Sequence, residues 1–481
     1  MAASAVQQKR IGLAYWMDEV LNQVEMVADG LRSDPVHDLR TALRRCRSLA
    51  DGLMVLDADP AWKKMRKAGK QLFGSLGELR DSHVLREWIE KLAPEGDPAA
   101  RVLRDFLNRR EQELQIAAVA ALQEFDRAKW NNWAHQLPSR AARIPLDSPV
   151  FAQLALERWY QARALHCRAL RNRTKVAFHD LRIGIKRFRY TVENFLPSLH
   201  DRWSADLKEL QDALGDVHDL DVLWHTALTI KVFPDSASQL AWRSRVQEER
   251  QRCLEKYRGK MVGTDSLWKV WRAGLPKPEH LRTIGFRRLE IWAAFLDPNV
   301  RHSRHVADLA TQLFDGLADR VPDDKRESCR QILRAAAAMH DVGYAKTNRG
   351  HHKASARMIR KLSAPLGWTA DEIRTVSLVA RYHRGALPSE TQKTFSDLPQ
   401  SKRWTVQFLG GILRFACACD TQQDAKIRRI DVESSTPVLT VRAEGYAQAT
   451  PLAEHLAAAR YLLELADRRP VFILPADPQA A

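Results

Sequence analysis

The sequence predicts a mainly α-helical protein, in which two related helical bundles in tandem precede a second helical domain with a small C-terminal β element. Apolar residues recur at helical spacing through most of the chain, and Gly and Pro gather between those segments. A pair of motifs also occurs twice in the N-terminal half. The length of 481 residues is typical of two or three domains.

Helical periodicity defines the expected elements of the N-terminal half. The segments are 10–30, 36–56, 61–74, 78–92, 99–127, 151–171, 176–196, 203–214, 218–230 and 237–258. We expect one domain over 1–270, with repeats at about 10–140 and 150–260, and a second helical domain over 279–420. Residues 421–481 should complete it, with a β-hairpin in 426–443 around Ser434-Ser435 and one amphipathic helix over 451–466.

Composition favours a folded cytoplasmic protein. The sequence has no apolar run of membrane-spanning length and no continuous signal-peptide core in its first 20 residues. Its six cysteines are scattered without a CxxC pair, which is typical of reduced thiols. The net charge is +17, with 44 Lys/Arg against 36 Asp/Glu in residues 1–270 and 32 against 23 in the remainder. Charge alone therefore selects neither half as an anion-binding site.

The internal repeat is the strongest feature of the first domain. Val36-His37-Asp38-Leu39-Arg40 and the basic residues after it match Phe178-His179-Asp180-Leu181-Arg182, at a shift of 142 residues. A Leu-Gly motif follows each copy, at Leu76-Gly77 and at Leu214-Gly215, with a shift of 138. We therefore expect the two bundles to be related to each other.

Each copy of the repeat carries a row of cations on one helix face. The offsets i, i+3, i+7 and i+10 place four side chains about one turn apart, roughly 5 Å. The two rows are His37, Arg40, Arg44 and Arg47, and His179, Arg182, Lys186 and Arg189. Lys70 and Lys208, each near the following Leu-Gly motif, are matching basic positions. A polyanion with repeating phosphates would neutralise both rows, and Arg suits it because its planar fork binds two oxygens.

A solvated surface helix is the alternative for any single basic row. Like charges at i+3 and i+4 destabilise a helix by tenths of a kcal/mol per pair, so a duplicated row favours a binding function. We expect Arg45 and Arg187 to be secondary, because they point about 100° away from the rows. The acidic residues of the motifs are expected to be structural, as helix-start acceptors or Arg partners: Asp38, Asp81, Asp180 and Asp219.

The duplicated motifs resemble the CHAD family, the conserved histidine α-helical domains. The resemblance covers about residues 10–260 and rests on the two His-Asp-Leu-Arg helices and the two Leu-Gly segments. It implies two pseudo-symmetric helical bundles around a basic central channel that binds inorganic polyphosphate. One departure is His218, which stands where the first copy has Arg80 and lowers the charge of the second copy.

The second domain contains a separate constellation of histidines. The doublet His340-Asp341 follows an apolar helix and can offer two adjacent ligands to a divalent metal. Histidines from neighbouring segments can complete such a site and can hold phosphate or a second metal. A lone His is usually a satisfied polar residue, but four His-bearing segments favour a site. The further segments contain His302 and His305, His351 and His352, and His383 with Arg384.

These segments resemble an HD domain, in particular the helical C-terminal region of the exopolyphosphatase and guanosine-pentaphosphate phosphatase family. The resemblance covers about 280–475 and implies metal ligands at His302, His340, Asp341 and Asp420. It also places His351, His352, His383 and Arg384 at phosphate or around the metal ligands. Cys417 stands where the family has an Asp ligand, and Ala354 replaces a His. A thiolate is a poor substitute for a carboxylate toward Mg²⁺ or Mn²⁺. The family's N-terminal catalytic domain is missing from this sequence, so its hydrolytic activity is not carried over.

Three functions follow as hypotheses. The first is a polyphosphate-binding protein that associates with polyphosphate granules or with polyphosphate-metabolising enzymes and whose second domain adds anion or partner binding. The second is a phosphohydrolase that uses Mn, Mg or Zn, with His340 and Asp341 as catalytic candidates, acting on polyphosphate or phosphorylated nucleotides. The third is a nonspecific nucleic-acid binder, for which the 14 Trp are possible stacking surfaces. Most Trp fall at apolar helical positions, and no recognition motif is present.

Overall fold

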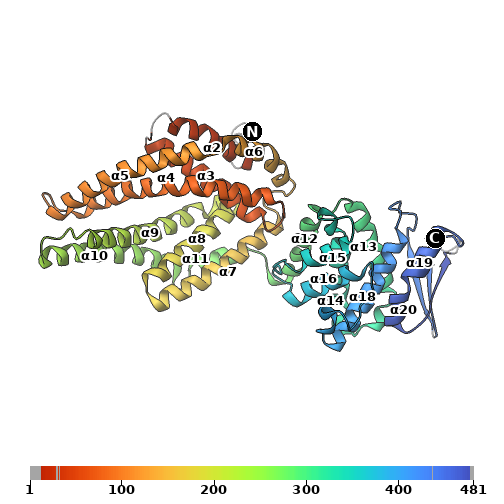
Figure 1. Cartoon of the computed structure of the whole chain (residues 1–481). Helices are drawn as coiled ribbons and strands as arrows, with labels where there is room; N and C mark the ends of the chain where they lie inside the picture. The colour runs from red at the N-terminus through yellow and green to blue at the C-terminus, as the bar shows by residue number, and fades with distance from the viewer. Residues whose placement is uncertain (1–11, 29–30, 32, 436, 477–481) are drawn as a thin grey trace. The chain divides into compact units, whose positions relative to one another are not determined.

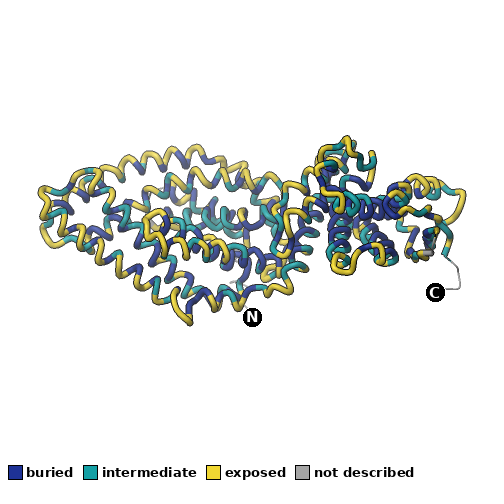
Figure 2. The backbone as a smooth tube through the Cα atoms, turned by 90° about the horizontal axis from the view of Figure 1, so that it is seen from below, coloured by how far each residue is buried: buried dark blue, intermediate teal, exposed yellow. Residues whose placement is uncertain are grey.

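The computed structural model describes residues 12–28, 31, 33–435 and 437–476, and it confirms the mainly α-helical fold with a small β element near the C-terminus (Figure 1). Apart from Leu56–Ala58, which is grouped with the second unit, the described residues up to Lys277 form one compact unit and those from Pro278 onward form a second. In each unit, buried residues lie on the inner faces of the helices and exposed residues on the outer faces (Figure 2). None of the described helices is long and apolar enough to cross a membrane.

The first unit consists of two sets of five helices. The first set is α2 (Leu13–Ala28), α3 (Ser33–Leu53), α4 (Pro60–Leu92), α5 (Pro98–Glu124) and α6 (Arg127–Ala141). The second set is α7 (Pro149–Asn172), α8 (Lys175–Phe195), α9 (Pro197–Thr229), α10 (Ser236–Met261) and α11 (Leu267–Ala273). In both sets the helix with the His-Asp-Leu-Arg motif packs on the long helix that follows it. Across the sets, α3 packs on α8 and α4 on α9, so the two copies of the motif face one core.

Two predicted breaks in the long helices were wrong. The segments 61–74 and 78–92 form the single helix α4, and 203–214 and 218–230 lie in the single helix α9. A Gly inside a helix costs about 1 kcal/mol relative to Ala, which tertiary packing offsets here. Leu72, Leu76 and Leu79 are buried along the whole middle of α4, so its apolar face continues through the Gly residues. The helices α6 and α11 were not predicted at all.

The second unit is a helical domain with a small sheet at its end. Its helices are α12 (Pro278–Ala294), α13 (Val300–Asp315), η1 (Ala318–Arg320), α14 (Asp323–Met339), η2 (Val342–Ala345), α15 (His351–Ile359), α16 (Ala370–Tyr382), α17 (Lys393–Ser396), α18 (Gln400–Cys419), α19 (Pro451–Ala459) and α20 (Tyr461–Asp467). The core forms where α13, α14, α16 and α18 meet, around residues such as Leu309, Val379 and Ile412.

The sheet contains one strand that the sequence analysis missed. β1 (Ile430–Ser435) and β2 (Val438–Ala443) form the predicted antiparallel hairpin, with Val432 opposite Val441. β3 (Val471–Pro475) then pairs with β2 in parallel, with Leu439 opposite Val471. The predicted helix over 451–466 is divided into α19 and α20, which meet at Arg460. These two helices form the crossover that a parallel pair of strands requires.

Candidate functional site

The first cation row is held on the inner face of α3 by contacts to α4. Arg40 Nη1 donates a hydrogen bond to the Leu76 carbonyl at 2.7 Å, and its guanidinium lies 5.0 Å from the Phe73 ring centre. A Cβ at Gly77 would lie 3.0 Å from Arg40 Nη1. Gly77 therefore leaves room for the Arg40 guanidinium.

Aromatic rings position two other cations of this row. Arg47 also lies against Phe73, with its guanidinium 4.8 Å from the ring centre. Arg44 lies 5.5 Å from the ring centre of Tyr190, which belongs to α8 in the second repeat. A guanidinium over an aromatic face is held there by the ring quadrupole. The contact to Tyr190 therefore brings the two rows to one location.

The guanidinium groups of both rows contain buried nitrogens without a hydrogen-bond partner among the described residues. These are the Nε atoms of Arg44, Arg47, Arg182 and Arg189. Buried donors in folded proteins are nearly always paired, and each unpaired one costs about 1–3 kcal/mol. Both rows therefore hold guanidinium nitrogens that suit an acceptor-rich ligand, although Arg189 Nε already lies 3.8 Å from a Glu193 carboxylate oxygen.

Charges from four helices interact at the centre of the two rows. Burial, together with the neighbouring Arg182 and Arg44, lowers the pKa of Lys186 on α8 to about 8. Burial raises the pKa of Asp219 on α9 to about 6, and Asp81 on α4 adds to this rise. Burial also lowers the pKa of Arg40, which Asp81 opposes. Cations from α3 and α8 and carboxyls from α4 and α9 thus form one electrostatic group.

The remaining predicted residues of the first unit lie at the edges of this group. His37 and His179 are exposed on α3 and α8, and Lys70 and Lys208 are exposed on α4 and α9. The His179 ring centre is 5.1 Å from that of His218. Burial and the nearby Arg182 lower the pKa of His218 to about 4, so His218 is neutral at pH 7.

One acidic residue that the sequence did not single out ties the two repeats together. Glu193 on α8 forms an ion pair with Arg45 on α3, and its side chain is only 9% exposed. Arg45 also donates to Asn194 at 3.2 Å, while Arg189 lies 3.8 Å from Glu193. Arg45 therefore holds α3 against α8, and it shares Glu193 with Arg189 of the second row. Asp180 likewise pairs with Arg168 on α7.

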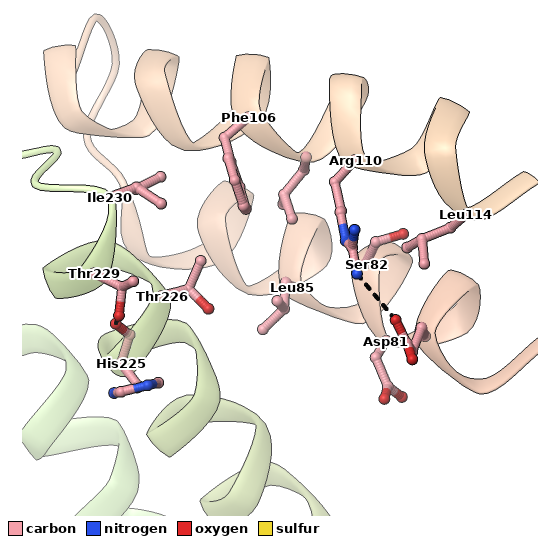
Figure 3. A pocket seen from close by; sticks show the side chains of 12 residues that line it. Asp81, Ser82, Leu85, Phe106, Arg110, Leu114, His225, Thr226, Thr229 and Ile230 are labelled. Carbon is pink, nitrogen blue, oxygen red and sulfur yellow. Dashed lines mark hydrogen bonds and ion pairs between the residues drawn. The ribbon is translucent and has the colours of Figure 1, made fainter. Parts of the chain in front are cut away.

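A cavity of about 320 Å³ lies between α4, α5 and α9, and Asp81 of the electrostatic group is part of its lining (Figure 3). Its walls are largely apolar and include Leu85, Phe106 and Ile230. Its cation, Arg110, is already paired with Glu78 at 3.1 Å and with Glu113 at 2.9 Å. This cavity therefore adds no unpaired positive charge to the rows.

The predicted histidines of the second unit meet around Asp341. One carboxylate oxygen, Oδ2, lies 3.3 Å from His340 Nε2 and 3.9 Å from His302 Nε2. The other oxygen, Oδ1, lies 3.3 Å from His351 Nε2 and 3.8 Å from His383 Nε2. All five side chains are buried. Asp341 therefore joins two groups of three metal-competent atoms, with one of its oxygens in each.

The histidine tautomers suit metal binding. His340 Nδ1 donates to the Ala337 carbonyl and His383 Nδ1 donates to the Ala380 carbonyl, both at 2.7 Å. Because Nδ1 is occupied in both rings, Nε2 is the nitrogen that faces Asp341 and that a metal would bind. His302 is fixed in the same way, because its Nδ1 lies 2.7 Å from Asp420 Oδ2. The donor set therefore fits one or two divalent cations.

Two protein-family models match parts of the chain. Residues 13–228 match the CHAD domain model. The chain carries a CHAD domain. Residues 292–455 match the Ppx/GppA phosphatase, domain III. Both resemblances predicted from the motifs are thereby confirmed, and no curated protein matches the chain.

The glycine of the His-Asp-Val-Gly motif in domain III has a packing role. Gly343 N donates to Ser355 Oγ at 2.8 Å, and Ser355 Oγ donates to the His340 carbonyl at 2.6 Å. A Cβ at Gly343 would overlap the His351 carbonyl oxygen and would lie 2.6 Å from Ser355 N. Gly343 therefore lets α15 approach close enough for His351 to reach Asp341.

Other predicted residues of domain III surround the two ligand groups. Asp420 lies outside both groups, where it orients His302 and accepts a hydrogen bond from Ala425 N at 2.8 Å. His352 is half-buried, and burial lowers its pKa to about 4. Arg384 is exposed on the rim of the pocket that His302, His340 and Asp341 line.

Cys417 on α18 contacts the histidine centre through His340. Although burial opposes it, the neighbouring Cys417 and Asp341 raise the pKa of His340 well above its usual value. The pocket over the centre has a volume of about 300 Å³ and includes three residues that sequence reasoning missed, namely Tyr344, Arg414 and His455. The Tyr344 ring stacks on His351 with 4.0 Å between ring centres. Nothing in the sequence linked His455 to the centre.

Proposed function

We propose that the protein binds inorganic polyphosphate in the cytoplasm through the CHAD domain. The observation that supports this most is the pair of cation rows, whose buried Nε donors lack partners among the described residues. A linear phosphate chain offers acceptor oxygens at every unit, so a single ligand can satisfy several donors in both rows. The match to the CHAD domain and the match to Ppx/GppA domain III both agree with a polyphosphate-related function.

The proposal is tested by comparing affinities for long-chain polyphosphate, tRNA and heparin at moderate salt. We expect polyphosphate to bind most tightly and a triple variant, Arg182→Gln, Lys186→Gln and Arg189→Gln, to lose at least about tenfold in affinity, since charge-assisted hydrogen bonds contribute about 1.5–3 kcal/mol each. The matched control removes three exposed charges from α4, by Lys63→Gln, Lys64→Gln and Lys67→Gln. Its effect should stay below about threefold, because each of these charges only adds to the general field.

Equal affinities for polyphosphate, tRNA and heparin would reject this function. They would favour a nonspecific nucleic-acid binder instead, whose affinity depends on total charge and salt. In that case both triple variants would lose affinity to a similar extent. Circular dichroism of each variant would show that the fold is retained. Association with polyphosphate granules or with polyphosphate-metabolising enzymes is a further part of the proposal, and co-sedimentation with granules would test it.

A second candidate function is a metal-dependent phosphohydrolase in domain III. The two oxygens of Asp341, each facing a different pair of histidines, favour it. A divalent metal held there would polarise a phosphoryl group and activate water. His302, His340, His351 and His383 would hold the metal, and Arg384 on the rim would attract the phosphate. If domain III has no hydrolase activity, we propose that it contributes anion or partner binding.

Phosphate release from polyphosphate and from phosphorylated nucleotides, with Mn²⁺, Mg²⁺ or Zn²⁺ added, tests the second candidate. We expect His340→Ala and Asp341→Ala to abolish turnover, because each removes a ligand from the centre. His280→Ala serves as the control, since His280 is exposed on α12 and belongs neither to the pocket nor to the two ligand groups. Turnover that persists in the Asp341→Ala protein, or no turnover with any of the three metals, would refute catalysis.

A further inference from the structure

A second pocket in the first unit lies away from the centre of the two cation rows. It has a volume of about 680 Å³ and is lined by residues from the end of α7, the start of α8 and the facing parts of α9 and α10. This size is within the range of pockets that hold a small organic ligand. Nothing in the sequence motifs pointed to it.

The pocket is strongly basic. Arg173 and Arg243 are exposed on its rim and form no ion pair with any described residue. Lys175 and Arg250 share a single carboxylate, that of Asp221, at 3.3 Å and 3.1 Å. Four cations thus face one acid, which leaves a net charge of +3. The lining therefore favours a ligand that carries several negative charges.

One wall of the same pocket is apolar and aromatic. Trp224 is half-buried there, while Leu228 is 40% exposed and Leu240 is 63% exposed. Val246 is buried and also lines the pocket. An inorganic phosphate chain gains nothing from such a wall, whereas a flat heterocyclic ring gains from contact with an indole and leucine side chains.

The polar and apolar halves together match one class of ligand. We propose that this pocket binds a nucleoside triphosphate, with the base against Trp224 and Leu240 and the phosphates at Arg173, Lys175, Arg243 and Arg250. The site goes beyond the proposed polyphosphate binding and does not require it. Asp221 also connects the pocket to the second row, because its charge acts on His218, whose ring centre is 5.1 Å from that of His179.

The test compares ATP with inorganic triphosphate, which has similar charge but no base. Isothermal titration of the full chain in excess EDTA keeps metal-dependent binding at domain III out of the measurement. We expect ATP to bind at least about tenfold more tightly than triphosphate, because only ATP contacts the apolar wall. Leu240→Ser should weaken ATP binding about fivefold and leave triphosphate unchanged, whereas Arg243→Gln should weaken both.

Matched controls use exposed residues outside the pocket. Ile116→Ser on α5 removes an apolar side chain that is 73% exposed, and Arg252→Gln removes an exposed charge from the same helix as Arg243. Neither should change the affinity for ATP. Equal binding of ATP and triphosphate, or unchanged ATP affinity in both pocket variants, would overturn the proposal.

Two further results separate this site from other possibilities. A single-stranded oligonucleotide could bind the pocket more tightly than ATP and displace it, with an affinity that the same variants lower. This result would assign the pocket to a nucleic-acid surface and overturn the nucleotide proposal. Failure of polyphosphate to exceed heparin in affinity, with ATP binding still weakened about fivefold in Leu240→Ser, would reject the proposed polyphosphate function and leave the nucleotide site standing.

Discussion

At the scale of single residues, the cation rows show how burial and like charges act together. Lys186 is surrounded by Arg182 and Arg44, and its pKa falls to about 8 because burial and these charges disfavour the ammonium form. Arg keeps its charge in the same surroundings because its intrinsic pKa is above 12. Among the Arg and Lys residues of the two rows, Lys186 is therefore the one whose charge changes near physiological pH.

This shift predicts a pH dependence of polyphosphate binding. A bound polyanion favours the protonated ammonium, so affinity is full below pH 8 and falls as Lys186 loses its proton above it. If the bound state restores the usual Lys pKa, affinity should fall about tenfold between pH 7 and pH 9. Titrations across this range would measure it. Lys186→Arg should keep its affinity at pH 9, and the same decline in that variant would contradict the assignment.

At the scale of elements, the helical fold was predictable because its signals are local. Periodic apolar residues defined the helices, and the repeated motifs predicted that α3 with α4 would resemble α8 with α9. The continuity of α4 through Gly77 was not predictable, because the contact of Gly77 depends on Arg40 from another helix. β3 was missed because a five-residue strand that ends in Pro475 gains its stability from pairing with β2.

The candidate sites were predictable as sets of residue types and not as geometry. The sequence grouped His302, His340, Asp341, His351 and His383, since each occurs in a recognisable motif. It could not assign the two oxygens of Asp341 to different histidine pairs, because that division depends on how α13, α15 and α16 pack around α14. Asp420 was expected to bind metal directly, and its position against His302 Nδ1 follows from the turn after α18. Glu193 carried no motif signal, because its partner Arg45 is far away in sequence.

At the scale of the whole molecule, two compact units carry two different ligand chemistries. The first presents rows of guanidinium and ammonium groups that suit phosphate oxygens, and the second presents imidazole Nε2 atoms and a carboxylate that suit a divalent metal. Each ligand should stabilise only the unit that holds it, because a ligand contributes free energy to the folded state that binds it.

Hydrogen–deuterium exchange with peptide resolution can locate both effects in the intact chain. At a concentration 100 times the dissociation constant, a ligand stabilises its unit by about 2.7 kcal/mol, so amides that exchange by unfolding of that unit should slow by about 100-fold. We expect Mn²⁺ to protect peptides from α13, α14, α16 and α18, and polyphosphate to protect peptides from α3 and α8. EDTA should reverse only the first effect, and His340→Ala should abolish only the first. Protection of the CHAD domain by Mn²⁺ that survives His340→Ala would mean that the metal acts through exposed carboxylates, and the assignment of the metal to Asp341 and its histidines would then be wrong.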